Sequence, residues 1–250
     1  MSTKPRIITL MFHRVNDASL GYQPAQFAKY LDYLVKHFPI VVPGDPLTED
    51  VAVCLTFDDA YYDFYHDVYP LLIKHNIKAV LAVSVGYIVD DTNVTPQERL
   101  SVPYVQGMED PKFACKTPFC TWKELREMSQ SGHVIIASHG LMHQNLADKN
   151  SDLTQEIILS QKILQERLGI PINNFVYPYG RMSEQSHKMV CQNYDYGIRI
   201  GSALNLGWDT KNRFVYRINA DPLWTKQKAI STLLIHKLTL KYWGNRLRLK

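Results

Sequence analysis

The sequence predicts an α/β fold with about seven parallel strands, closed into a barrel, and two observations support it. Short apolar runs alternate with segments of helical spacing along most of the chain, which is typical of a parallel sheet. In addition, the ends of different strand candidates are followed by His13, Asp58, Asp59, His139 and Tyr179. In a closed barrel such ends meet on one face, where the chemistry of these folds is located. This convergence favours a barrel over an open sheet.

The first third of the chain is expected to hold three strands and two helices. Ile7–Phe12 is a short apolar run, and Pro24–His37 has helical spacing with proline in its first turn, where a missing N–H costs nothing. Val51–Phe57 is apolar and β-branched, as in a buried strand. Ala60–His75 has apolar residues three and four apart, which predicts a helix directly after the strand. Ala79–Val83 is the third strand.

A long irregular stretch, 86–120, separates the third strand from the next helix. Its repeated prolines and glycines argue against regular elements, and a loop of this length usually serves as a lid or a binding loop. Thr121 and Glu124 form a capping-box pattern, so a helix is expected to begin at Trp122 and to end at Gly132.

The remaining elements are assigned by the same periodicities and by their capping residues. Serine before a helix and glycine or proline after it mark the boundaries. In chain order we expect strand Val134–Ser138, helix Leu153–Leu168, strand Phe175–Tyr177, helix Ser183–Asn193, strands Tyr196–Ile200 and Phe214–Ile218, and a final helix Thr225–Tyr242.

Length and composition indicate one globular domain. With 250 residues, 46% of them hydrophobic, we expect a single domain over 1–250, with a basic C-terminal helix and tail from about 222. The net charge of +4 is too small to indicate a nucleic-acid partner. Neither a spanning run of about eighteen apolar residues nor a signal-peptide core is found, so we expect a cytoplasmic location. The oligomeric state is left open.

Two pairs of polar residues indicate a metal site. Asp58 and Asp59 follow a strand, and adjacent carboxylates resist ionising together unless a cation or a proton is shared, although one of them can also cap a helix. His139 and His143 are four apart, so both imidazoles can face one ion if the segment turns helically. Two histidines and one carboxylate suit catalytic zinc or non-haem iron. The spare carboxylate favours a hydrolase, which needs a base beside the activated water.

Three motifs in this sequence resemble those of the polysaccharide deacetylases, the NodB-homology domain of carbohydrate esterase family four. They are Thr56-Phe57-Asp58-Asp59, Ser138-His139-Gly140-Leu141-Met142-His143 and Tyr177-Pro178-Tyr179-Gly180, in the family's order and spacing. The third is similar to the F-x-[YW]-P-Y-G form of the branch that includes biofilm poly-N-acetylglucosamine deacetylases. The resemblance covers about 7–218 and implies a distorted (β/α) barrel of the NodB type that removes N-acetyl groups from amino sugars.

The resemblance also implies a role for each matched residue. Asp58 matches the general base and Asp59 the metal-binding carboxylate, while His139 and His143 match the two histidine ligands. Tyr179 matches the residue whose backbone N–H helps to hold the oxyanion. The cofactor is then a divalent metal, zinc in the first place, with cobalt, nickel and manganese as alternatives. The partner is an N-acetylated oligo- or polysaccharide.

The chain departs from the family pattern at two points. The family's last motif, Leu-x-His, supplies a general acid, and His236 fits its letters but lies inside an expected helix. His13, which follows the first strand, is the rival for this role. Many members also carry an arginine before the third motif that tunes the base. That arginine is missing here, and Arg14, Arg181 and Arg217 remain as unranked substitutes.

Two other functions stay open. The first keeps the fold and changes the bond, to an O-acetyl ester on a sugar or a formyl group on a lipid-linked saccharide. The second is a non-catalytic glycan-binding relic of the fold. Since all ligand and base positions are filled, the residues argue against loss of activity.

The C-terminal segment is basic and amphipathic. After Asp221 there is no acidic residue, while lysines and arginines alternate with leucines and aromatic residues. Such a segment either packs on the barrel with a solvated basic tail or makes peripheral contact with an anionic membrane.

Overall fold

The apolar runs of the sequence form strands, most of them buried on both faces as in parallel sheets covered by helices. The computed structural model describes residues 5–104, 106–208 and 214–248. Its strands are β1 (Arg6–Phe12), β2 (Val51–Phe57), β3 (Ala79–Val83), β4 (Val134–Ser138), β5 (Asn174–Val176), β6 (Tyr196–Ile200), β7 (Asn205–Leu206) and β8 (Phe214–Asn219).

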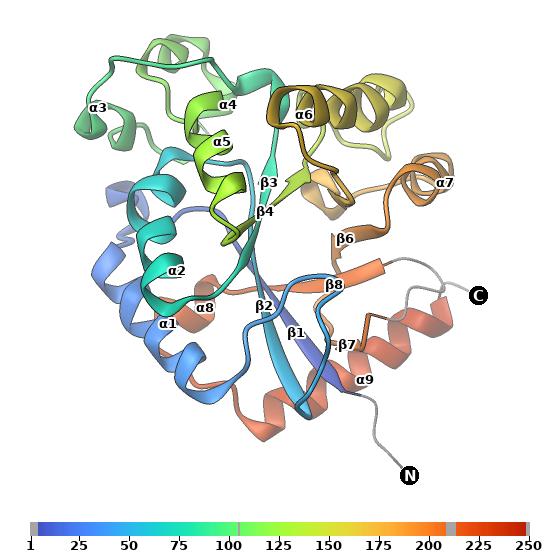
Figure 1. The fold of residues 1–250 in the computed structure, drawn as a ribbon. Coiled ribbons are helices and arrows are strands. Elements are labelled where there is room, and N and C mark those ends of the chain that lie inside the picture. The colour runs from blue at the N-terminus through green and yellow to red at the C-terminus, as the bar shows by residue number, and fades with distance from the viewer. Residues whose placement is uncertain (1–4, 105, 209–213, 249–250) are drawn as a thin grey trace.

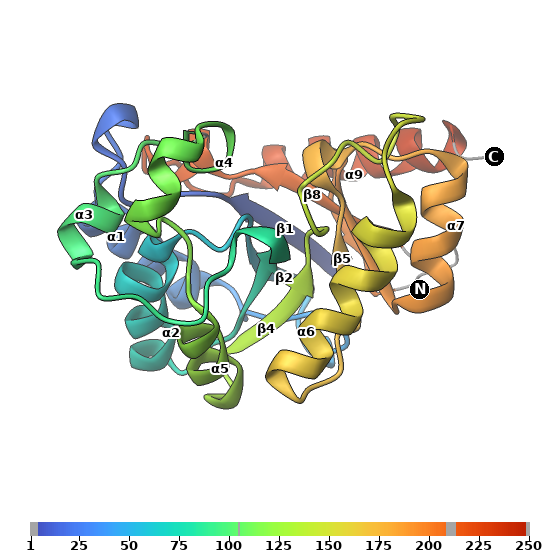
Figure 2. The same cartoon turned by 90° about the horizontal axis from the view of Figure 1, so that it is seen from above.

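The helices lie around these strands (Figure 1). They are α1 (Pro24–His37), α2 (Tyr69–His75), α3 (Pro96–Leu100), α4 (Gln106–Glu109), α5 (Trp122–Gln130), α6 (Ser160–Leu168), α7 (Glu184–Asn193), α8 (Asp221–Trp224) and α9 (Thr232–Arg248). Figure 2 shows α6 and α7 on the side of the barrel opposite α1 and α2. Among the described residues, no helix has both the length and the apolar character needed to cross a membrane.

Seven parallel strands close into a barrel, which confirms the expected fold. Over the described residues the order is β2-β3-β4-β5-β6-β8-β1, and β1 pairs with β2 as well. The short β7 runs antiparallel to β1. The barrel is distorted because its pairing is uneven. Strands β1 and β2 pair from Arg6–Val51 to Phe12–Phe57, whereas β4 and β5 meet only at Ser138 and Phe175.

Alternation along the strands divides the apolar core into two clusters. The side chains of Ala52, Cys54 and Ala82 belong to a small cluster that includes residues of most of the strands. Their neighbours Val53 and Leu55 belong to the larger cluster, which includes the helices. Since successive side chains point to opposite faces of a strand, the small cluster fills the barrel interior. Small residues fit there because the interior is narrow.

The helix expected from Ala60 begins later than the spacing indicates. Ala60 has a left-handed backbone (φ 55°), and its carbonyl accepts a hydrogen bond from Cys120 N–H. Tyr61 forms an antiparallel bridge with Phe119. Residues after β2 therefore pair with the distant loop first. The helical segment begins at Tyr62 and contains a π-helical turn at Phe64–Val68.

Two further expectations are corrected. The stretch 86–120 contains short helices, because Thr95 caps α3 with a capping box and Asp110 caps a 3₁₀ turn. The final helix begins at residue 232 instead of 225. Gln227 has a left-handed backbone (φ 48°), and the Ser231 hydroxyl accepts a hydrogen bond from Leu234 N–H at the helix start.

Candidate functional site

The carboxyl ends of β1, β2, β4 and β5 bring the expected site residues together. His13 follows β1, Asp58 and Asp59 follow β2, His139 follows β4, and the turn after β5 carries Tyr179. Asp58, Asp59 and His139 are almost fully buried at 2–3% exposure, so they lie at the bottom of the site. This grouping arises from barrel closure, which places the ends of parallel strands on one face.

Asp59, His139 and His143 form one compact group. A ligand atom from each lies within 4.8 Å of the other two. Asp59 Oδ1 is 3.5 Å from Nε2 of His139 and 3.5 Å from Nε2 of His143. Their spacing of four residues suggested a shared helical turn, but the two histidines do not lie on one. The segment is a loop in which Gly140 and His143 have left-handed backbones (φ 86° and 54°).

Burial favours the neutral form of both imidazoles, and Nε2 of each faces Asp59 Oδ1. Burial lowers the pKa of His139 to about 4, and burial with the neighbouring His139 lowers the pKa of His143 to about 3. His139 Nδ1 lies 2.8 Å from the Val176 carbonyl, so this nitrogen carries the proton and Nε2 keeps its lone pair. A backbone carbonyl behind a ligating histidine is the usual support of a metal site.

The residues of this group fit a divalent cation. Asp59 Oδ1 is buried and has no hydrogen-bond partner within the described part of the chain. Burial and the nearby Asp58 raise the pKa of Asp59 well above its usual range, so its negative charge lacks compensation. One carboxylate oxygen and two imidazole nitrogens are the ligand types of catalytic zinc and related ions. A cation here would satisfy the unpaired oxygen.

Asp58 is held by Arg217 of β8. The guanidinium donates from Nη1 to Oδ1 at 2.5 Å and from Nη2 to Oδ2 at 2.9 Å, and both side chains are buried. Burial opposes ionisation of Asp58, but Arg217 and then His139 outweigh it and hold the pKa far below the usual range. Of the three arginines considered as substitutes for the missing family arginine, Arg217 is therefore the one that contacts Asp58. Arg14 instead pairs with Asp63, and the exposed Arg181 lines the cavity above.

His13 lies beside Asp58, with Nε2 3.9 Å from Oδ2, and its side chain is 24% exposed. Burial lowers its pKa, while the charge of Asp58 opposes this. The ring of Tyr104, from the long loop, lies 5.2 Å from the His13 ring. The backbone N–H of Tyr104 donates to Asp17, so the loop is fixed near the site. The stretch 86–120 was expected to be a lid or a binding loop, and Tyr104 brings part of it next to His13.

His236 is not brought to this group. It is exposed on α9 and does not line the cavity above the metal group.

Tyr179 has a left-handed backbone (φ 56°, ψ 7°) in the turn Pro178–Gly180. Its ring lies 4.6 Å from the ring of His143 and is 61% exposed. A left-handed backbone is uncommon outside glycine and concentrates at functional sites. Asp59, His143 and Tyr179 all adopt it, so the surrounding fold holds these three residues in conformations that they would rarely adopt alone.

Glu156 supports the histidine loop and was missed in the sequence. Its buried carboxylate accepts backbone N–H bonds from Leu141, Met142 and Gln144. A Cβ on Gly140 would lie 2.2 Å from Glu156 Oε2, so only glycine fits there. The available signal was the position of Glu156 on the apolar face of its helix, three residues after Leu153, where a charge needs partners.

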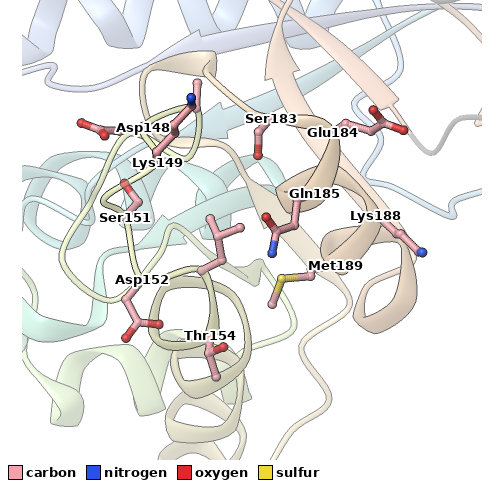
Figure 3. Close-up of a pocket in the computed structure, with 12 residues that line it drawn as sticks. Asp148, Lys149, Ser151, Asp152, Thr154, Ser183, Glu184, Gln185, Lys188 and Met189 are labelled. Carbon is pink, nitrogen blue, oxygen red and sulfur yellow. The ribbon is translucent and has the colours of Figure 1, made fainter.

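Two adjacent cavities lie on this face. The first, about 1010 Å³, is lined by His13, His143 and Tyr179 together with residues of the loop 142–151. The second, about 690 Å³, lies between that loop and the start of α7, and Asp148 and Ser151 line both. Figure 3 shows the loop residues facing α7 across this second cavity.

The fold is a barrel whose carboxyl-terminal face presents a candidate Asp-His-His metal group with a spare carboxylate beside it. This arrangement is suited to metal-assisted hydrolysis. A family profile described as polysaccharide deacetylase matches residues 46–197. This range includes every residue of the metal group as well as Asp58 and Tyr179. The chain belongs to the polysaccharide deacetylase family.

Relatives in sequence agree with this family. Over 119 residues the chain is 37% identical to the poly-beta-1,6-N-acetyl-D-glucosamine N-deacetylase of Escherichia coli (strain K12), which covers 48% of this chain and 15% of that protein. This chain therefore spans a small part of that relative's length. YxkH of Bacillus subtilis (strain 168), named as a polysaccharide deacetylase, is 22% identical over 221 residues, 84% of this chain and 68% of that protein.

Solved structures share the fold. The Streptococcus pyogenes deacetylase PplD in complex with acetate superposes with a TM-score of 0.67 at 22% identity, over 87% of this chain and 93% of that chain. IcaB from Ammonifex degensii gives a TM-score of 0.65 at 19% identity, over 89% of this chain and 95% of that chain.

Proposed function

We propose that this protein is a metal-dependent N-deacetylase of amino sugars in a polysaccharide or glycoconjugate. The observation that carries the proposal is the pairing of two unlike carboxylates. Asp58 is kept ionised by Arg217, whereas Asp59 lies unpaired between two neutral histidines. Adjacent carboxylates in such different environments are suited to different tasks, one to accept a proton and one to bind a metal.

The metal ligands in this proposal are Asp59, His139 and His143. A divalent ion held by them would polarise the acetyl carbonyl and acidify a water molecule. We assign zinc as the ion, with cobalt, nickel and manganese as alternatives, since the ligand types suit each of them.

Asp58 accepts the proton of the attacking water in this scheme. The fork of Arg217 fixes both carboxylate oxygens, so the base keeps one orientation during the reaction. The backbone N–H of Tyr179 is assigned to the developing oxyanion, a contact worth about 3–4 kcal/mol in comparable sites.

His13 is assigned as the general acid for the leaving amine. It lies next to Asp58 and lines the cavity, so a proton taken up at Asp58 is close to a group that also reaches substrate. A partly buried imidazole with a lowered pKa is a strong donor once it is protonated. Because His236 is exposed on α9, His13 is favoured as the general acid.

A polymer of N-acetylglucosamine is the substrate class that we propose. The E. coli relative is named for β-1,6-linked poly-N-acetylglucosamine, and the third motif here resembles that branch. The two adjoining cavities suit a chain longer than one sugar, because a unit in the first could continue past Asp148 and Ser151 into the second. Gln185 and Met189 of α7 point towards that second space (Figure 3).

Acetate release from N-acetylglucosamine oligomers tests the proposal. We expect release by the metal-loaded protein, none after chelation, and one divalent ion per chain that is lost in Asp59→Asn. Asp195→Asn, an exposed aspartate, serves as the control and should retain both metal and activity. Release from O-acetylated or formylated sugars alone would assign the alternative bond. Metal binding and sugar binding without any release would indicate a glycan-binding relic and refute the proposal.

A further inference from the structure

Helix α9 packs on the barrel with one face and exposes apolar side chains on the other. The packed face includes Ile235, Leu238 and Tyr242, each at most 9% exposed. On the opposite face, Leu233, Leu240, Trp243 and Leu247 are 79%, 74%, 53% and 70% exposed. Because a helix advances about 100° per residue, these four lie along one stripe, which we call the apolar stripe. Packing on the barrel therefore explains only one of the two apolar faces.

Positive charge borders the apolar stripe. Lys237 and Lys241 are exposed on α9, and the sequence contains no acidic residue after Asp221. Arg246 lies over the ring of Tyr242 on the other flank. Lys250, part of the basic tail expected from the sequence, lies outside the described residues. An apolar stripe bordered by cations is complementary to an anionic lipid surface, where acyl chains and phosphates are both available.

A cavity of about 490 Å³ lies beside the stripe. Gly201 and Ser202, which follow β6, line one side, and Lys237, Leu240, Lys241 and Asn245 of α9 line the other. Asn245 donates to the Gly201 carbonyl at 2.9 Å, which fastens the helix to this loop. Two ammonium groups and a hydroxyl next to an exposed leucine match a phosphate with an attached acyl chain.

We propose that the apolar stripe and this cavity form a docking surface for an anionic phospholipid bilayer. A lipid phosphate lies between Lys237 and Lys241, and the apolar stripe enters the boundary between headgroups and acyl chains. A second copy of the chain fits less well. In a two-fold contact through the same surface, the lysines of both copies would face each other without an acidic partner on α9.

Binding to lipid vesicles tests the proposal directly and independently of any enzymatic activity. The full chain is sedimented with vesicles of phosphatidylcholine alone and of phosphatidylcholine with phosphatidylglycerol, at low and high salt. We expect binding to the anionic vesicles only, and weaker binding at high salt. Lys237→Gln with Lys241→Gln should lower the partition coefficient about thirtyfold, because one lysine near an anionic surface changes it by about fivefold.

The apolar part of the surface is tested by Leu240→Ser with Trp243→Ser, which should also abolish most binding. The matched control is Ile73→Ser with Lys74→Gln on α2, which removes one exposed apolar residue and one lysine elsewhere, and it should bind like the unmodified chain. The emission of Trp243 is obtained by subtracting the fluorescence spectrum of Trp243→Phe from that of the unmodified chain. Its maximum should shift to shorter wavelength when anionic vesicles are added.

Three outcomes would overturn the proposal. The first is equal binding to neutral and anionic vesicles, and the second is a control that loses binding as strongly as the α9 variants. The third is the absence of vesicle binding together with a dimer in sedimentation velocity that Leu240→Ser with Trp243→Ser converts to a monomer. That result would assign the stripe to self-association.

Discussion

Arg217 and Asp58 lie 159 positions apart in the chain and form a bidentate ion pair at the bottom of the site. Each is at most 4% exposed, and Arg217 also donates to the hydroxyl of Thr56, which precedes the acidic pair. The pair joins β8 to the end of β2 across the barrel. In the proposed reaction, this pair keeps the base Asp58 ionised and oriented.

Arg217→Lys should lower kcat about 10²-fold while the bound metal is retained. Lysine keeps the positive charge but offers one point of contact instead of a planar fork, so Asp58 loses its fixed orientation. Deacetylation kinetics and metal content measured on the same preparation check this. The control is Arg126→Lys, an exposed arginine on α5. An unchanged kcat would show that orientation by Arg217 is unimportant.

His13→Gln and His236→Gln separate the two candidates for the general acid. We expect His13→Gln to lower kcat by about 10²–10⁴, the range typical of an acid–base residue. His236→Gln should leave kcat unchanged, because this residue is exposed on α9. Metal content should be the same in both variants. If His236→Gln instead removes activity and His13→Gln does not, the assignment is reversed.

Glu156→Gln should weaken metal binding about 10- to 100-fold, the usual effect of losing a support behind metal ligands. The carboxylate accepts hydrogen bonds from the backbone N–H groups of Leu141, Met142 and Gln144. In the glutamine variant an NH₂ group replaces one of the two accepting oxygens, and this group cannot accept a hydrogen bond. Titration of the metal-free protein with zinc measures the change. Glu166→Gln, exposed on α6, is the control. Equal affinities in the two variants would contradict the supporting role.

The sequence predicted the strands well because each is a short apolar run that ends in polar residues. Boundaries such as 51–57, 79–83 and 134–138 agree with the structure. The approach failed where backbone geometry depends on distant residues. The left-handed Ala60 pairs its carbonyl with Cys120, so the helix after β2 begins late. Helical spacing in the sequence cannot register such a contact.

The grouping of the candidate metal ligands was predicted from residue type and spacing, but the residues that support them were not. Asp59, His139 and His143 gather as expected, through a loop instead of a helix. Arg217 was one of three candidate arginines for the partner of Asp58. Choosing it requires knowing that β8 pairs with β1 in the closed barrel. A charged residue within an apolar strand was the only local signal. Pairing of this kind is decided by tertiary structure.

Arg99→Met should lower the free energy of unfolding by about 3–5 kcal/mol, the usual cost of breaking a buried ion pair. The guanidinium donates to both oxygens of Glu124 and to the carbonyls of Thr117 and Phe119, and it lies 3.5 Å from the centre of the Tyr62 ring. It therefore fixes the long loop to the start of α5. Urea unfolding measures the loss.

The control for this variant is Arg126→Met, an exposed position whose free energy of unfolding should change by less than about 0.5 kcal/mol. Because the same loop places Tyr104 against His13, Arg99→Met should also raise KM at temperatures where it stays folded, with metal content unchanged. A stable Arg99→Met protein with unaltered KM would mean that the loop holds its position without this ion pair. The order of the loop would then depend on its aromatic contacts, of which Tyr61 with Phe119, 4.6 Å between ring centres, is the first to test.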